Sequence, residues 1–88
     1  MKEMKQRSED LESIPGIGPR IAQKLELIGV RRVSDLKDSN PEQLYKKLEL
    51  TIGAHTDRCV LYVFRSAIYY ASHQTHDPEK LKWWNWKE

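Results

Sequence analysis

Segment 13–25, SIPGIGPRIAQKL, constrains the fold of this chain more than any other stretch. Pro15 disfavours helical geometry at the residue before it, so a preceding helix has to end there. Pro19 suits the first position of a new helix, where its missing N–H would have had no partner. Gly16 and Gly18 allow the positive φ angles and close approaches that a tight bend needs. The segment therefore predicts two helices joined by a tight hairpin.

Further start and stop signals predict a chain made of short helices. The first helix is expected at about 8–13, with Ser8 as its N-cap, and the chain before it is expected to be flexible. After Pro19, an apolar stripe repeats at helical spacing and Gly29 is placed as a left-handed cap. The residues of this stripe are Ile21, Ala22, Leu25 and Ile28.

The second half of the chain carries the same kind of signal. Ser34 is expected to cap one short helix, and Asn40, with Pro41 after it, is expected to cap another that has Gln43 in a capping box. A loop around Gly53 follows. The longest helix is expected at about 57–72 with Thr56 or Asp57 as cap, and Asp77 and Pro78 start a last short one. The buried stripe of the longest helix is predicted to be Val60, Phe64, Ala67, Ile68 and Ala71.

No segment shows the alternation of a strand, so the expected class is all-α: a compact bundle of five or six short helices. Its 88 residues suit one domain, placed at 8–88 after a flexible segment at 1–7. One cysteine excludes an internal disulfide or a zinc cluster and suits a reducing compartment. The charged N-terminus has no apolar run, and no segment is long enough to span a membrane. We therefore expect a cytoplasmic protein.

The charge distribution points to the hairpin as a binding site. Net charge is only +2, but residues 16–37 hold five basic and two acidic side chains. Unpaired N–H groups at a helix N-terminus bind anions, and a nucleic-acid phosphate is the expected anion here. The residues predicted to take part are Gly16, Ile17, Gly18, Arg20, Ile21 and Lys24. Ile17 either presses on a sugar or caps the core, and the whole turn can also be explained as a simple connection between packed helices.

The string LESIPGIGPRIAQKL resembles the helix–hairpin–helix motif of DNA repair and recombination proteins. Together with GVRRVSDLKDSNPEQLYKKL, HTDRCVLYVFRSAIYYA and KWWNWK, it resembles the small bacterial pathogenicity-locus family, whose members are also called mitomycin-resistance proteins. The resemblance implies a SAM/helix–hairpin–helix-like fold and DNA binding. Residues 33–48 stand where a second motif is expected, but their hairpin, KDSNP, has no glycine and so predicts a scaffolding half.

Several other residue sets have two readings. Arg58, Tyr62, Arg65 and Tyr69 form one stripe that, with Trp86, is either a partner surface or an intramolecular packing layer. We expect Trp83 or Trp84 to be buried and Trp86 to be partly exposed. His73, His76 and Asp77 are read as a solvated helix end rather than a metal site. Cys59 is read as a small buried hydrophobe.

These observations predict a non-catalytic module that binds the DNA backbone weakly and without sequence preference. Arg20 follows the glycine hairpin where a helix–hairpin–helix glycosylase needs a lysine or aspartate nearby, and arginine cannot act as a nucleophile. No enzyme activity and no cofactor are expected. The alternative is a protein-interaction adaptor that uses the hairpin surface and the tryptophan tail toward an unidentified protein. Oligomeric state is not predicted.

Overall fold

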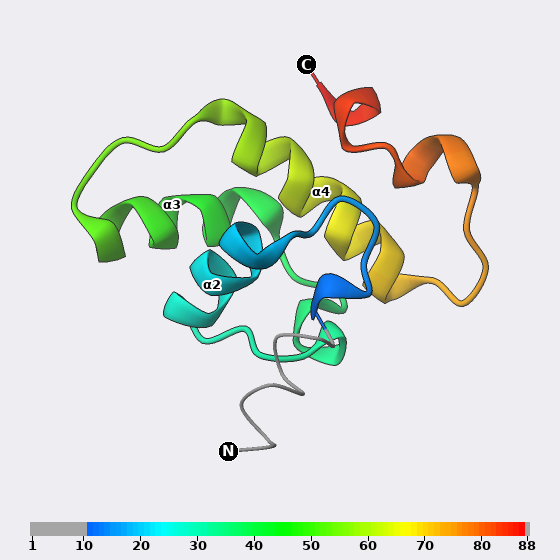
Figure 1. Cartoon of the computed structure of the whole chain (residues 1–88), viewed down its shortest axis with the longest axis horizontal. Coiled ribbons are helices and arrows are strands. Elements are labelled where there is room, and N and C mark those ends of the chain that lie inside the picture. The colour runs from blue at the N-terminus through cyan, green and yellow to red at the C-terminus, as the bar shows by residue number, and fades with distance from the viewer. Residues whose placement is uncertain (1–10, 88) are drawn as a thin grey trace.

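Helix α4 (Arg58–Ser72) is the element on which most of the others pack (Figure 1). In this computed structural model, which describes residues 11–87, α4 contacts α3 and all three short 3₁₀ helices. Its buried face includes Phe64, which is fully inaccessible to solvent. Asp57 begins the helix, because its side chain accepts the N–H of Cys59 at 2.9 Å.

Residues 11–87 contain three complete α-helices and three 3₁₀ helices, with no strand, so the expected class is confirmed. The elements are α2 (Pro19–Leu27), η1 (Val33–Leu36), α3 (Pro41–Ile52), α4, η2 (Pro78–Leu81) and η3 (Trp83–Trp86). The expectation of five or six short helices is wrong in detail. The three short segments close with i→i+3 bonds, such as Asn85 N–H to the Lys82 carbonyl at 3.0 Å.

Most of the predicted helix ends are confirmed by their hydrogen bonds. The Asn40 side chain accepts the N–H groups of Glu42 and Gln43 at 2.9 and 3.1 Å. After α2, Gly29 has φ 91°, its N–H bonds to the Glu26 carbonyl, and Val30 N–H bonds to the Leu25 carbonyl. This pair of bonds is a Schellman motif, which the glycine makes possible.

Two predicted boundaries need correction, and a third can be compared only in part. Ser34 lies inside η1 and does not cap it, because η1 begins at Val33 with Arg32 as its N-cap residue. The Asp35 carboxylate accepts the N–H groups of Arg31 and Arg32 at this end. Helix α3 extends to Ile52, so the loop begins only at Gly53, whose φ is 68°. The helix expected at 8–13 begins outside the described residues. Of its expected residues that the structure describes, 11 and 12 are helical and 13 is in a turn.

The core is one continuous apolar cluster contributed by the hairpin, α2, η1, α3 and α4. Its buried members are Leu11, Ile14, Ile17, Ala22, Leu25, Ile28, Val30, Leu36, Tyr45, Leu48, Val60, Leu61, Val63, Phe64, Ala67 and Ile68. Ala71 packs against this cluster but is only partly buried. Cys59, expected to be buried, is exposed, because it lies in the first turn of α4 on the side away from the core.

The radius of gyration, 12.2 Å, is near the roughly 12 Å of a compact chain of this length. In the part of the chain that the structure describes, no helix is both long and apolar enough to cross a membrane.

Candidate nucleic-acid interface

The hairpin before α2 is a bend held by its own backbone. Ile14 N–H donates to the Leu11 carbonyl at 3.1 Å, and Ile17 N–H donates to the Ile14 carbonyl at 3.0 Å. Gly16, between these two bonds, has φ 90°, a conformation that side-chain-bearing residues rarely adopt. The bend therefore requires a glycine at position 16.

Gly18 has a different role, because its backbone is ordinary. It is the N-cap of α2 with φ −96° and ψ −176°, an extended conformation open to any residue. A β-carbon on Gly18 would meet no described atom within 4 Å. The glycine thus leaves open space in front of the first turn of α2.

The N-terminus of α2 differs from those of α3 and α4. Asn40 and Asp57 cap the latter two with side-chain oxygens, whereas no described side chain caps α2. The first helical bond runs from Ala22 N–H to the Gly18 carbonyl at 3.0 Å. Within residues 11–87, no acceptor is bonded to the amides of Gly18, Arg20 or Ile21. These N–H groups form the free end of the α2 dipole.

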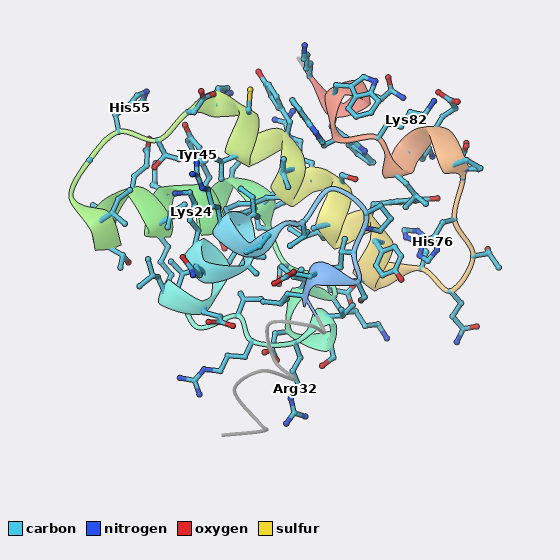
Figure 2. The ribbon with its side chains drawn as sticks, in the orientation of Figure 1. Lys24, Arg32, Tyr45, His55, His76 and Lys82 are labelled. Carbon is cyan, nitrogen blue, oxygen red and sulfur yellow. The ribbon has the colours of Figure 1, made fainter. Side chains whose placement is uncertain are left out.

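The side chains around this end are basic or apolar. The first turn of α2 contains no acidic residue, and Arg20 is exposed. Lys24, one turn later, is half-buried (Figure 2). Neither cation makes an ion pair with another described residue. Arg32 projects from the opposite edge of the molecule to the C-terminal segment and lies apart from Lys24 in this view.

Ile17 and Ile21 were predicted as site residues, and both side chains face inward to different degrees. Ile17 is 4% exposed and belongs to the core, so of its two predicted roles the structure shows the core contact. Ile21 is half-buried and packs against the same cluster. The Ile17 amide is already bonded to the Ile14 carbonyl, so of these two residues only Ile21 offers an amide to a ligand.

The C-terminal segment borders the hairpin (Figure 1). Trp83 Cδ1 lies 3.5 Å from the position that a β-carbon on Gly16 would occupy. Trp83 is half-buried and packs against the core. No local sequence signal links position 16 to position 83, so this neighbour of the site was not foreseen.

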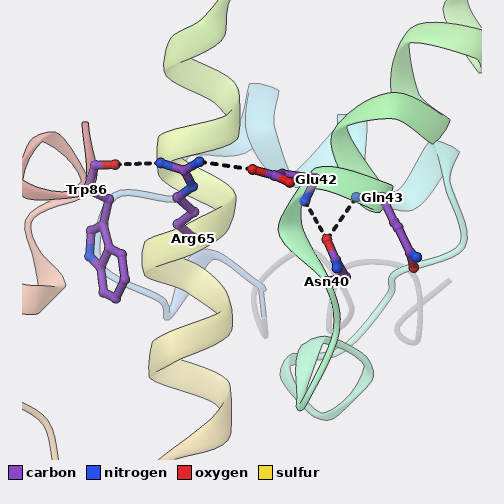
Figure 3. Close-up of polar contacts among 5 residues, drawn as sticks. All are labelled: Asn40, Glu42, Gln43, Arg65 and Trp86. Carbon is purple, nitrogen blue, oxygen red and sulfur yellow. Dashed lines mark hydrogen bonds and ion pairs between the residues drawn. The ribbon is translucent and has the colours of Figure 1, made fainter. Parts of the chain in front are cut away.

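The predicted partner stripe is largely occupied by contacts within the molecule. Arg65 Nη1 donates to the Trp86 carbonyl at 2.9 Å, and Arg65 Nη2 donates to Glu42 at 3.2 Å (Figure 3). The Arg65 guanidinium lies 5.7 Å from the Tyr62 ring, and the rings of Tyr69 and Trp86 are 5.9 Å apart. Of the two predicted roles of the stripe, these contacts correspond to intramolecular packing under the C-terminal tryptophan segment.

Arg58, the first residue of the stripe, lies apart from this layer. It lines an open cleft of about 380 Å³ with Tyr45, Glu49 and His55. The buried Tyr45 hydroxyl donates to the Thr56 carbonyl in this region, and burial raises the pKa of Tyr45.

The exposure of the tryptophans agrees with the prediction for Trp86 but not for Trp83 and Trp84. Neither Trp83 nor Trp84 is fully buried: Trp83 is half-buried, and Trp84 is 50% exposed. Trp86 is half-buried, in line with its predicted partial exposure, and its indole N–H donates to the Lys80 carbonyl at 2.8 Å. Trp84 is therefore the most exposed of the three tryptophans.

His73 and His76 serve the packing of the 73–77 turn. His73 Nδ1 lies 3.0 Å from the Tyr69 carbonyl, and His76 Nε2 lies 2.8 Å from the Tyr70 carbonyl. The His76 and Tyr70 rings stack at 4.5 Å. Among residues 11–87, no group of three His, Cys, Asp or Glu side chains is placed to hold a metal ion.

Comparison with known proteins identifies the family. The chain is similar to the mitomycin resistance protein McrB of Streptomyces lavendulae, with 29% identity over 77 residues that cover 88% of this chain and 70% of that protein. No solved structure matches the chain. The family described as Pathogenicity locus (Cdd1) matches residues 4–88. The chain therefore belongs to the pathogenicity-locus family.

Proposed function

We propose that this protein is a non-catalytic DNA-binding module that holds a backbone phosphate at the hairpin before α2. The main-chain N–H groups of Gly16, Gly18, Arg20 and Ile21 are the donors, and Arg20 and Lys24 add positive charge. In this proposal residues 11–27 form a helix–hairpin–helix motif. The observation that carries it is the uncapped N-terminus of α2, next to a glycine with open space before it.

The neighbouring charges support an anionic ligand. A phosphate at this position would meet the positive end of the α2 dipole and the exposed Arg20 side chain, with no carboxylate in the first turn to repel it. All of these contacts go to phosphate oxygens. Binding of this kind positions a protein on DNA without reading the bases.

The second half of the chain offers no equivalent site. In the turn at 37–40, the Asn40 side chain already accepts the N–H groups of Glu42 and Gln43, so the first turn of α3 is capped. Asp38 N–H donates to the Ser72 hydroxyl at 3.0 Å, which ties this turn to α4. We therefore assign the η1–α3 half a scaffolding role and propose one phosphate contact region per chain.

One contact region predicts weak binding with little salt dependence. Neutralising one or two phosphates gives a slope of log K on log salt of about −1 to −2. A labelled oligonucleotide titrated at ~50 mM salt, where such binding is strongest, measures both affinity and slope by fluorescence anisotropy.

The test variant is Gly18→Val. Because Gly18 has extended backbone and open space around its β-position, valine fits the fold but shields the amides. We expect Gly18→Val to lose binding, and Arg20→Gln to weaken it. The matched control is Arg32→Gln, which removes the same charge from the far edge of the molecule. Equal binding by wild type and Gly18→Val, or no binding by either, contradicts the proposal.

A second candidate function is a protein-interaction adaptor, favoured by apolar side chains away from the hairpin. Leu27 at the end of α2 and Leu50 and Ile52 at the end of α3 are 59%, 80% and 42% exposed, and the two helices contact each other. Such residues mark interaction surfaces when they cluster. Light scattering of wild type and Leu50→Asp tests self-association through this surface, and a monomer in both cases argues against it.

A further inference from the structure

We propose that the DNA held at the hairpin is single-stranded, and that Trp84 stacks on one of its bases. This inference rests on the proposed function, because it takes the hairpin as the phosphate site. To the phosphate contact it adds a base contact by Trp84, and it specifies that the nucleic acid is single-stranded. The juxtaposition that carries it is an exposed indole in the same short segment that packs against Gly16.

Trp84 is the tryptophan that the packing of the C-terminal segment leaves in solvent. Trp83 is held against the hairpin, and Trp86 is tied to α4 through the Arg65 guanidinium. Trp84 lies between them with 50% of its surface exposed, and its ring meets that of Trp83 edge-on, at 5.8 Å and 86°. Because both flanking tryptophans are anchored, Trp84 is presented on a fixed support rather than on a free tail.

The position of this support relates Trp84 to the phosphate site. Trp83 Cδ1 is 3.5 Å from the β-position of Gly16, and the ring centroids of Trp83 and Trp84 are 5.8 Å apart. The indole of Trp84 is therefore separated from the hairpin by the Trp83 ring alone, and we place on it the base of a nucleotide whose neighbouring phosphate contacts the amides. Figure 1 shows the C-terminal segment immediately next to the hairpin.

The charge of both segments fits a polyanion. Residues 80–87 contain Lys80, Lys82 and Lys87 and no acidic side chain, and residues 16–24 contain Arg20 and Lys24 and no acidic side chain. The Glu79 carboxylate lies beside this segment, where it pairs with Lys82 (labelled in Figure 2) at 3.2 Å and accepts the Asn85 side-chain amide at 3.3 Å. Both members of the pair are exposed, so water screens it. The excess of basic over acidic residues in these two segments favours a polyanion over an apolar protein surface.

The exposed ring favours a single strand over a duplex. A base in a duplex is already stacked between its neighbours, and its face is not available to a side chain. A base in a single strand presents its face, and aromatic side chains beside a positive groove use it without sequence preference. The ligand is therefore expected to be single-stranded DNA.

The experiment compares three ligands of equal length: a single strand, the matching duplex and a single strand made of abasic sites. Wild-type protein is expected to bind the normal strand more tightly than the other two. The Trp84→Ala variant should bind the normal strand roughly 5- to 100-fold more weakly, the usual effect of one lost base stack, and bind the abasic strand as wild type does.

Matched variants separate stacking from folding. Trp84→Tyr keeps a ring and should retain most of the affinity. Leu50→Ala removes a still more exposed apolar side chain on α3 and should leave DNA binding unchanged. Quenching of tryptophan fluorescence by the normal strand should be reduced in Trp84→Tyr although binding persists. Circular dichroism of each variant checks that it is folded.

The outcomes distinguish the two proposals. Unchanged binding of the normal strand by Trp84→Ala, equal loss with the abasic strand, or tighter binding of the duplex overturns the stacking inference and leaves the hairpin site intact. Loss of all binding in Gly18→Val together with the predicted Trp84 effects supports both. Absence of binding to every ligand by wild type overturns the proposed function and this inference with it.

Discussion

The indole of Trp83 lies against Gly16, with its Cδ1 atom 3.5 Å from where a β-carbon on that glycine would stand. The contact joins the C-terminal segment to the hairpin, although the two residues are far apart in the sequence. Gly16 and Gly18 are only two residues apart, but the structure gives them different tasks. Gly16 makes the bend and accepts Trp83, and Gly18 leaves the α2 amides open.

The two glycines are therefore expected to respond differently to alanine. Gly16→Ala forces a β-carbon into φ 90° and should destabilise the protein by about 1–2 kcal/mol. Gly18→Ala should change stability by less than about 0.5 kcal/mol, since its gain in unfolded-state entropy is offset by a poorer N-cap residue. Urea unfolding of both variants measures the difference. Equal losses at the two positions would show that the assignment of roles is wrong.

Arg65 is expected to hold the C-terminal segment on α4. Replacing it with methionine keeps the stem but removes the charged bond to the Trp86 carbonyl. Arg65→Met should lower the free energy of unfolding by about 1.5–3 kcal/mol, the range for hydrogen bonds to charged groups. Amide exchange at residues 83–87 should become faster, as hydrogen-exchange mass spectrometry can measure.

The control for Arg65→Met is a substitution of Glu42, which forms an ion pair with Arg65. Glu42 is well exposed, with 66% of its side chain accessible, so its ion pair with Arg65 is screened by water. Glu42→Gln should cost less than about 1 kcal/mol and leave exchange at 83–87 unchanged. An effect of Glu42→Gln as large as that of Arg65→Met would mean that the ion pair, and not the bond to Trp86, anchors the segment.

Cys59 is exposed, yet its thiol is expected to react slowly near neutral pH. A hydrogen bond to the Asp57 carboxylate raises the pKa of Cys59 above its ordinary value of 9.0. A raised pKa means less thiolate at any given pH, and the thiolate is the reacting form. The pH profile of alkylation should therefore lie at higher pH than that of a free cysteine.

Asp57→Asn tests the cause of this shift. Asparagine still caps α4 but carries no charge, so the alkylation profile should move back to lower pH. The measurement is the rate of reaction with a thiol reagent between about pH 7 and pH 10, on either side of the ordinary pKa. An unchanged profile in Asp57→Asn would contradict the assigned role of Asp57.

Helix ends could be predicted from the sequence because their signals are local. Pro19, Asn40 and Asp57 each act within one turn, and the structure places them at the starts of α2, α3 and α4. Ser34 was misread because η1 begins one residue earlier, at Val33, so that Arg32 is its N-cap residue and Ser34 lies inside it.

Contacts between distant segments could not be predicted in the same way. The exposure of Cys59 depends on which side of the first turn of α4 faces the core, and the spacing of apolar residues leaves that turn undecided. The exposure of Trp84 depends on the anchoring of Trp83 by Gly16 and of Trp86 by Arg65. These tertiary contacts leave no local pattern in the sequence. The segment WWNW therefore indicated an interaction-prone tail but not which of its rings is exposed.

The most direct test of the central claim is an amide-shift titration of the ¹⁵N-labelled protein with a short single-stranded DNA. The account predicts that the largest shifts fall on the backbone amides of Gly16, Gly18, Arg20 and Ile21, accompanied by the Trp84 indole N–H, and that Gly18→Val abolishes them. Shifts confined to the Arg58–Ser72 helix or the α3 end, or no shifts at DNA concentrations well above that of the protein, would contradict it.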